Sequence, residues 1–211
     1  MPRKPKTLTP REFSAILIAA RFAVGRRDGA EEVIAHAVRN NSVPPDFFGE
    51  LFLHLSLLLG YPTMLDGLTR LREIVPPAPA SRIRPNVSER SAYVKGRKMI
   101  AKVYGRTTNR LLANLRTLHE QVPSIIVRDA YGRIISRGGM TLRERELVNV
   151  VVLSIQGLNR QLYSHLRGAL RVGVTASALR DAILRGSREA GSRSRTPLEM
   201  LASLTEARHR P

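Results

Sequence analysis

Apolar side chains recur every three or four residues along much of the chain, as they do on one face of a helix. One such stripe is formed by Leu111, Leu112, Leu115 and Leu118. No segment alternates apolar and polar residues between turn signals, which is the pattern of a half-buried strand. The hydrophobic pattern therefore predicts an all-α fold.

Two segments, 9–41 and 141–173, match each other without a gap when the sequence is displaced by 132 residues. In each, a threonine stands where a helix N-cap would, and a glutamate three residues later completes a capping box. These pairs are Thr9 with Glu12 and Thr141 with Glu144. A glycine then stands where a left-handed C-cap would end the helix, at Gly25 and at Gly157. The matched helix starts and ends predict two related helical repeats.

The repeat and a proline-rich stretch divide the chain into three parts. Residues 1–77 are predicted to be a first, degenerate repeat, 78–90 a linker, and 91–211 a second repeat with a loosely ordered C-terminal end. Within that end, the Ser-, Arg- and Gly-rich stretch 186–200 predicts a loop, and 197–207 a last helix.

Positive charge is concentrated in the second half of the chain. Of the net +18, residues 78–145 carry 15 Lys and Arg against 4 acids, and residues 160–195 carry 8 Arg against 2 acids. This asymmetry indicates an anionic partner, either nucleic acid, a membrane surface or a carboxylate ligand. The alternative is compositional, because 30 of the 35 cations are arginine and GC-rich coding sequence accumulates arginine without any function.

The absence of cysteine excludes disulfides, thiolate metal sites and a thiol redox cycle. The scattered His36, His54 and His119 have no second metal ligand three or four residues later, since Asn40 is a poor one, so no metal site is predicted. Glu50 and His54 interrupt the longest apolar run, 47–62, which falls short of the ~20 apolar residues that a membrane helix needs. We therefore expect a cytoplasmic protein without a membrane partner.

The stretch 129–175 carries a series of motifs that resembles the carboxymuconolactone decarboxylase family, whose wider superfamily includes the alkylhydroperoxidase D proteins. The motif residues are Tyr131-Gly132, Ser136-Arg137-Gly138-Gly139, Arg143, Arg145, His165, Ala169, Gly173 and Thr175. Residues 95–105 and 47–73 are similar to other parts of a family domain. The resemblance implies the helical fold of that family, assembly as a homo-oligomer (dimer, trimer or hexamer), and no cofactor.

The peroxidase branch of this superfamily uses two cysteines to reduce peroxide, while a glutamate and a histidine relay the proton. In this chain the glutamate of that pattern falls on Glu146 and the histidine on His165, but the cysteines fall on Leu158 and Gln161. Without a thiolate there is no nucleophile to attack a peroxide, so thiol peroxidase activity is excluded.

The decarboxylase branch does not need cysteine, and the resemblance implies loss of CO2 from, or isomerisation of, a small carboxylate or lactone acid. A histidine suits the proton transfer, a neighbouring glutamate orients the imidazole, and arginines bind the carboxylate of the substrate. The predicted catalytic residues are His165 and Glu146. The predicted substrate-binding residues are Arg137, Arg143, Gln161 and Tyr131.

Each of these residues also has a purely structural interpretation, as a hydrogen-bonded core histidine, a helix-end glutamate, an interface arginine or a core tyrosine. In the first repeat the positions of Glu146, Gln161 and His165 hold Ser14, Gly29 and Val33, so any site belongs to the second repeat. The alternative function is an inactive helical scaffold whose basic segments bind nucleic acid or another polyanion. The sequence has no recognised DNA-reading motif and few aromatic residues to stack on bases.

Overall fold

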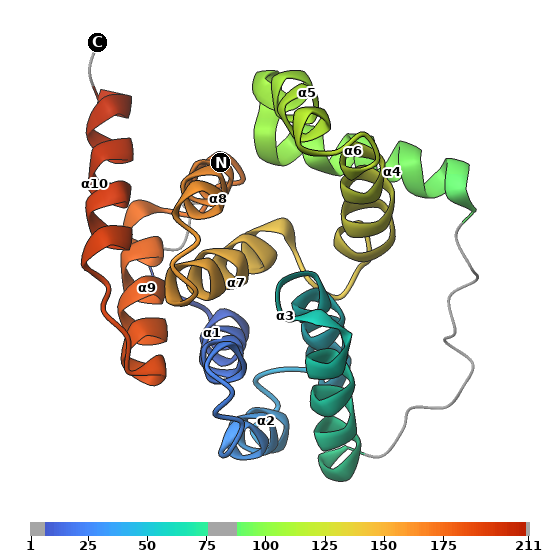
Figure 1. Cartoon of the computed structure of the whole chain (residues 1–211). Coiled ribbons are helices and arrows are strands. Elements are labelled where there is room, and N and C mark those ends of the chain that lie inside the picture. Colours follow the sequence, from blue (N-terminus) through green and yellow to red (C-terminus); the bar gives the residue numbers. More distant parts are fainter. Residues whose placement is uncertain (1–6, 76–87, 210–211) are drawn as a thin grey trace.

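The computed structural model describes residues 7–75 and 88–209, and the described residues form helices and loops without a strand (Figure 1). The predicted all-α fold is confirmed. The elements are α1 (Pro10–Ala23), α2 (Ala30–Arg39), α3 (Pro45–Ile74), α4 (Glu89–Tyr104), the short 3-10 helix η2 (Gly105–Thr107), α5 (Thr108–Leu118), α6 (Val122–Ile125), the π-helix η3 (Ile126–Ile135), α7 (Leu142–Ile155), α8 (Asn159–Arg171), α9 (Ala176–Ala190) and α10 (Arg195–His209). Most of the predicted linker 78–90 lies outside the described residues.

Helices α1 and α7 begin as the sequence predicts. In each capping box the threonine hydroxyl accepts the N–H of the glutamate three residues on, and that glutamate accepts the N–H of the threonine. Gly25 and Gly157 follow the two helices with φ of +70° and +68°, a left-handed conformation that glycine adopts without strain. Local sequence therefore fixes both ends of these helices.

The two capped helices lie against each other at the centre of the molecule, and ten of the fourteen residues of α7 are buried (Figure 1). Arg11 Nε donates to Glu144 Oε1 at 2.7 Å, and Arg143 bonds reciprocally to Glu12. The apolar core is shared in the same way, since Ile16 of α1 packs with residues of α7, α8 and α9. Residues of the two ranges predicted as repeats thus pack in shared apolar clusters.

Helix α4 and the π-helix η3 pack with their backbones in close approach. A Cβ on Gly96 would lie 1.8 Å from the Val127 carbonyl oxygen, and a Cβ on Gly132 would lie 2.0 Å from that of Ala92. Only glycine fits at these two positions. This contact holds α4, and Tyr104 at its end, in place beside α8.

Two regions differ from the sequence-based expectation. Helix α3, although bent at Gly60, is by length and composition one described helix that could cross a membrane. The helix extends past residue 62, where the sequence analysis ended the apolar run. Its polar side chains Glu50 and His54 point into the protein and are 12% and 0% exposed. The loop predicted over 186–200 was wrong outside residues 191–194: α9 continues to Ala190 and α10 begins at Arg195, and the buried Ala190 and Leu201 anchor the two helices on the core.

Candidate functional site

Neighbouring helices bring the two predicted catalytic residues together. Glu146 of α7 is 1% exposed, and His165 of α8 presents its Nδ1 to Glu146 Oε2 at 2.9 Å. An ionised carboxylate only accepts hydrogen bonds, so Nδ1 is the donor in this contact and Nε2 is the ring nitrogen not engaged by Glu146. The side chain of His165 is 17% exposed, so the ring lies at the boundary between core and solvent.

Two further buried residues extend this contact into a polar chain of four, namely His54, Asn149, Glu146 and His165. Asn149 Nδ2 donates to Glu146 Oε1 at 3.2 Å and lies 3.3 Å from His165 Nδ1. On its other side, Asn149 Oδ1 accepts from His54 Nε2 at 2.9 Å. The polar chain therefore crosses from α3 through α7 to α8.

His54 supports this chain as a neutral group. Complete burial, together with the nearby positive charge of Arg145, lowers the pKa of its imidazole from 6.5 to about 3. An imidazole that is neutral at physiological pH keeps one N–H, and the geometry places that proton on Nε2, facing Asn149. His54 is thus a permanent hydrogen-bond donor to the amide.

Tyr104, at the end of α4, covers the other side of the histidine. Its ring lies edge-on to His165 and edge-on to Tyr131, with 6.4 Å between the ring centroids in each pair. Burial, together with the carboxylate of Glu146, raises the pKa of Tyr104 to about 12, so the hydroxyl stays protonated. Tyr131 of η3 is 4% exposed and packs against Tyr104, which in turn packs against His165.

The other predicted substrate-binding residues lie apart from the His165–Glu146 pair. Arg137 donates to Glu50 through Nε and Nη2, the shortest contact being 2.7 Å. Arg143 bonds to Glu12 and, through Nη1, to the carbonyl of Gly173 at 3.2 Å. Gln161 is exposed one turn before His165 on α8. Both arginines therefore already hold carboxylates from the N-terminal part of the chain.

Asn149, His54 and Tyr104 are site residues that the sequence analysis did not predict. A polar residue inside the apolar run of α7 and a histidine inside that of α3 are local signals of buried hydrogen bonding. No such signal shows that the two meet, because 95 residues separate them. Within residues 7–75 and 88–209 no group of three metal-ligating side chains is present.

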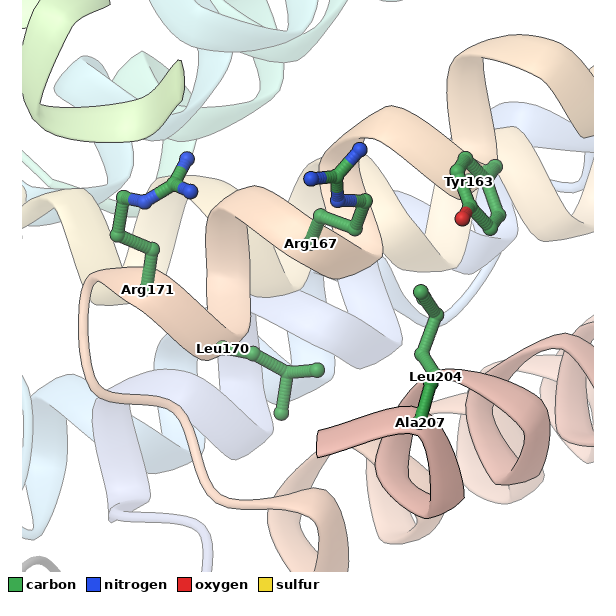
Figure 2. Close-up of a pocket in the computed structure, with 6 residues that line it drawn as sticks. All are labelled: Tyr163, Arg167, Leu170, Arg171, Leu204 and Ala207. Atoms are coloured by element: carbon green, nitrogen blue, oxygen red, sulfur yellow. The ribbon is translucent and has the colours of Figure 1, made fainter. Parts of the chain in front are cut away.

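A groove of about 240 Å³ lies between α8 and the η2–α5 segment, next to the polar chain. Its wall includes Tyr104, which contacts His165, and Gly168, where a Cβ would lie 3.1 Å from Glu146 Oε2. A second hollow of about 320 Å³ lies on the α10 side of α8, between Tyr163 and Leu204 (Figure 2). Two residues of the groove wall, Tyr104 and Gly168, are therefore also neighbours of the His165–Glu146 pair.

Comparison with known proteins defines the class of this fold and site. The carboxymuconolactone decarboxylase family model matches residues 126–194. The chain is 33% identical over 106 residues to 4-carboxymuconolactone decarboxylase from Acinetobacter baylyi, covering 50% of this chain and 79% of that protein. It is 26% identical over 202 residues to peroxisomal protein 2 from Schizosaccharomyces pombe, covering 92% and 94% of the two chains. The chain belongs to the carboxymuconolactone decarboxylase family.

Proposed function

We propose that the protein is a cofactor-free lyase or isomerase that acts on a small carboxylate or lactone acid, with His165 as the proton-transfer group. The observation that carries this proposal is the 2.9 Å contact between His165 Nδ1 and the buried Glu146 carboxylate. A carboxylate on one ring nitrogen stabilises the imidazolium that forms when the other nitrogen takes a proton. The chain contains no cysteine, so thiolate-based peroxide reduction is not part of the proposal.

In the decarboxylation of a lactone acid, the bond from carbon to the carboxylate breaks and CO2 leaves. The electron pair stays on carbon and is delocalised into the conjugated carbonyl system, and a proton must then be delivered to carbon. Protonated His165 supplies that proton from Nε2 and regains one from solvent. Asn149 and His54 position Glu146, and so the ring, without touching the substrate.

The A. baylyi relative is named for its action on 4-carboxymuconolactone, which makes this compound the first substrate to test. We expect the wild-type protein to release CO2 from it, and the His165→Asn variant to lose about 100-fold in kcat, the usual contribution of a general acid–base group. The assay follows CO2 and loss of the lactone by chromatography. The matched control is Arg180→Gln, an exposed residue of α9.

Equal rates in the wild type and in His165→Asn, at unchanged melting temperature, contradict the role of His165. No turnover of 4-carboxymuconolactone or of any related lactone acid by the wild type contradicts the proposed reaction class.

A further inference from the structure

We infer that the groove between α5 and α8 binds the carboxylate groups of a small polycarboxylate. It is called the arginine groove here because Arg110 of α5 and Arg167 and Arg171 of α8 line it. Its remaining polar lining is uncharged, with hydroxyl groups from Thr107 and Ser164, and its lining contains neither aspartate nor glutamate. That the arginine groove binds an anion is argued from these lining residues alone. That the anion is a substrate rests on the proposed function.

The helices that form the groove carry positive charge without compensation. Neither the segment 105–118 nor the segment 159–171 contains an acidic residue. Their six arginines are Arg106, Arg110, Arg116, Arg160, Arg167 and Arg171. Within the described part of the chain none of these forms an ion pair with a carboxylate, whereas Arg137 and Arg143 are paired with Glu50 and Glu12. The three groove arginines are therefore among the guanidinium groups available to an external anion.

Two of the three groove arginines are held in place by the protein. Arg171 Nη1 donates to the Val103 carbonyl at 3.0 Å, and its guanidinium lies so close to Gly105 that a Cβ there would be 3.0 Å from Arg171 Cζ. Arg167 lies over the ring of Tyr163, 5.9 Å from its centroid. Both arginines lie at the boundary between the groove and the hollow beside Leu204 of α10, and both line each of the two (Figure 2). Such preorganisation lowers the entropy cost of binding an anion.

The size and lining of the groove favour a small ligand over nucleic acid. A volume of about 240 Å³ is below the 300–1,000 Å³ that is typical of pockets for drug-sized ligands. Tyr104 is the one aromatic residue that lines it, and both Tyr131 and His165 lie against its ring. Stacking of a base therefore lacks a free aromatic face. Several guanidinium groups around a small volume match a molecule with two or three carboxylates.

Calorimetric titration of the full chain with propane-1,2,3-tricarboxylate at low ionic strength tests the inference. We expect saturable binding that weakens with added salt. Arg110→Gln and Arg167→Gln should each weaken it about fivefold to tenfold, as expected for loss of a charge-assisted contact. Both side chains are exposed, so neither variant should change the melting temperature. Arg180→Gln, which removes the same charge from α9, should bind as the wild type does.

His165→Asn separates this inference from the proposed function, because it should retain full binding even where it abolishes turnover. Binding without any lactone-acid turnover supports the arginine groove and contradicts the reaction alone. Two results overturn the inference. One is no binding of the tricarboxylate, whether or not the protein binds a DNA duplex. The other is equal weakening of tricarboxylate binding by Arg180→Gln and Arg167→Gln.

Discussion

The side-chain amide of Asn149 lies between a donor and an acceptor. Its Oδ1 accepts from His54, and its Nδ2 donates to Glu146. Rotating the amide by half a turn would bring two donors together on one side and two acceptors on the other, so one orientation satisfies both partners. The same amide thereby fixes the carboxylate that holds His165. At this scale, the geometry of the His165–Glu146 pair depends on a buried amide on the neighbouring turn of α7.

The neutral state of His54 gives a prediction about stability and pH. The pKa of His54 is about 3 in the folded protein, against 6.5 ordinarily, so on acidification the unfolded chain takes up a proton that the folded chain does not. Stability is therefore lost as the pH falls below about 6.5, by up to about 1.4 kcal/mol per pH unit. His54→Gln removes this dependence while keeping a donor for Asn149.

Urea unfolding at pH 7, 6 and 5 checks this expectation. The free energy of unfolding of His54→Gln should fall less steeply with decreasing pH than that of the wild type. The exposed His36 provides the control, since His36→Gln should keep the wild-type slope. Parallel slopes in the wild type and His54→Gln would mean that His54 does not resist protonation.

The His165–Glu146 contact could be predicted from the sequence because both residues fall within one recognisable motif series. His54 and Asn149 could not be paired in this way, since their contact depends on how α3 packs against α7. The carboxylate partners of Arg137 and Arg143 escaped prediction for the same reason: Glu50 and Glu12 lie 87 and 131 residues away.

Among the helices, the contact between α4 and η3 depends on glycine. Gly96 has no room for a methyl group beside the Val127 carbonyl, so Gly96→Ala must push the two helices apart. We expect it to cost at least about 2 kcal/mol, as overpacking against a rigid neighbour does. Tyr104 would move with α4, so turnover should also fall.

Gly49→Ala is the matched control, because no atom lies within 4 Å of its added Cβ in α3. An alanine within a helix should stabilise the protein there by about 0.5–1 kcal/mol. Thermal unfolding of both variants measures the difference. Equal melting temperatures for Gly96→Ala and the wild type would contradict the close backbone approach.

Helix boundaries were predictable where local chemistry sets them, as at Thr9, Thr141, Gly25 and Gly157. The end of α5 at Leu118 and the π-helical geometry of η3 were not predictable. Apolar residues spaced three or four apart fit an α-helix and a π-helix equally well. Packing against α4 is a tertiary property that the stripe does not encode.

Across the whole molecule, the reciprocal pairs Arg11–Glu144 and Arg143–Glu12 join the N-terminal and C-terminal parts. Glu12 is 2% exposed, and glutamine at this position would keep the capping box but lose the charge that Arg143 needs. We expect Glu12→Gln to destabilise the protein by about 1–3 kcal/mol.

A double-mutant cycle with Arg143→Gln tests this expectation by urea unfolding. The two changes should be strongly non-additive, because each removes the same interaction. The exposed Asp181–Arg185 pair of α9 is the reference, with a coupling of about 0.5 kcal/mol or less. Additive losses for Glu12 and Arg143 would show that the reciprocal pairs do not join the two parts.

His54 lies on α3, outside the family-matched residues 126–194, and this position limits which segment can be moved into another family member. The matched stretch contains Glu146, Asn149 and His165, but the donor that orients Asn149 comes from α3. A chimera that carried residues 126–194 alone into another family member would leave the amide carbonyl buried and unpaired unless the host supplied a donor. Transfer of the polar chain therefore requires α3 together with α7 and α8.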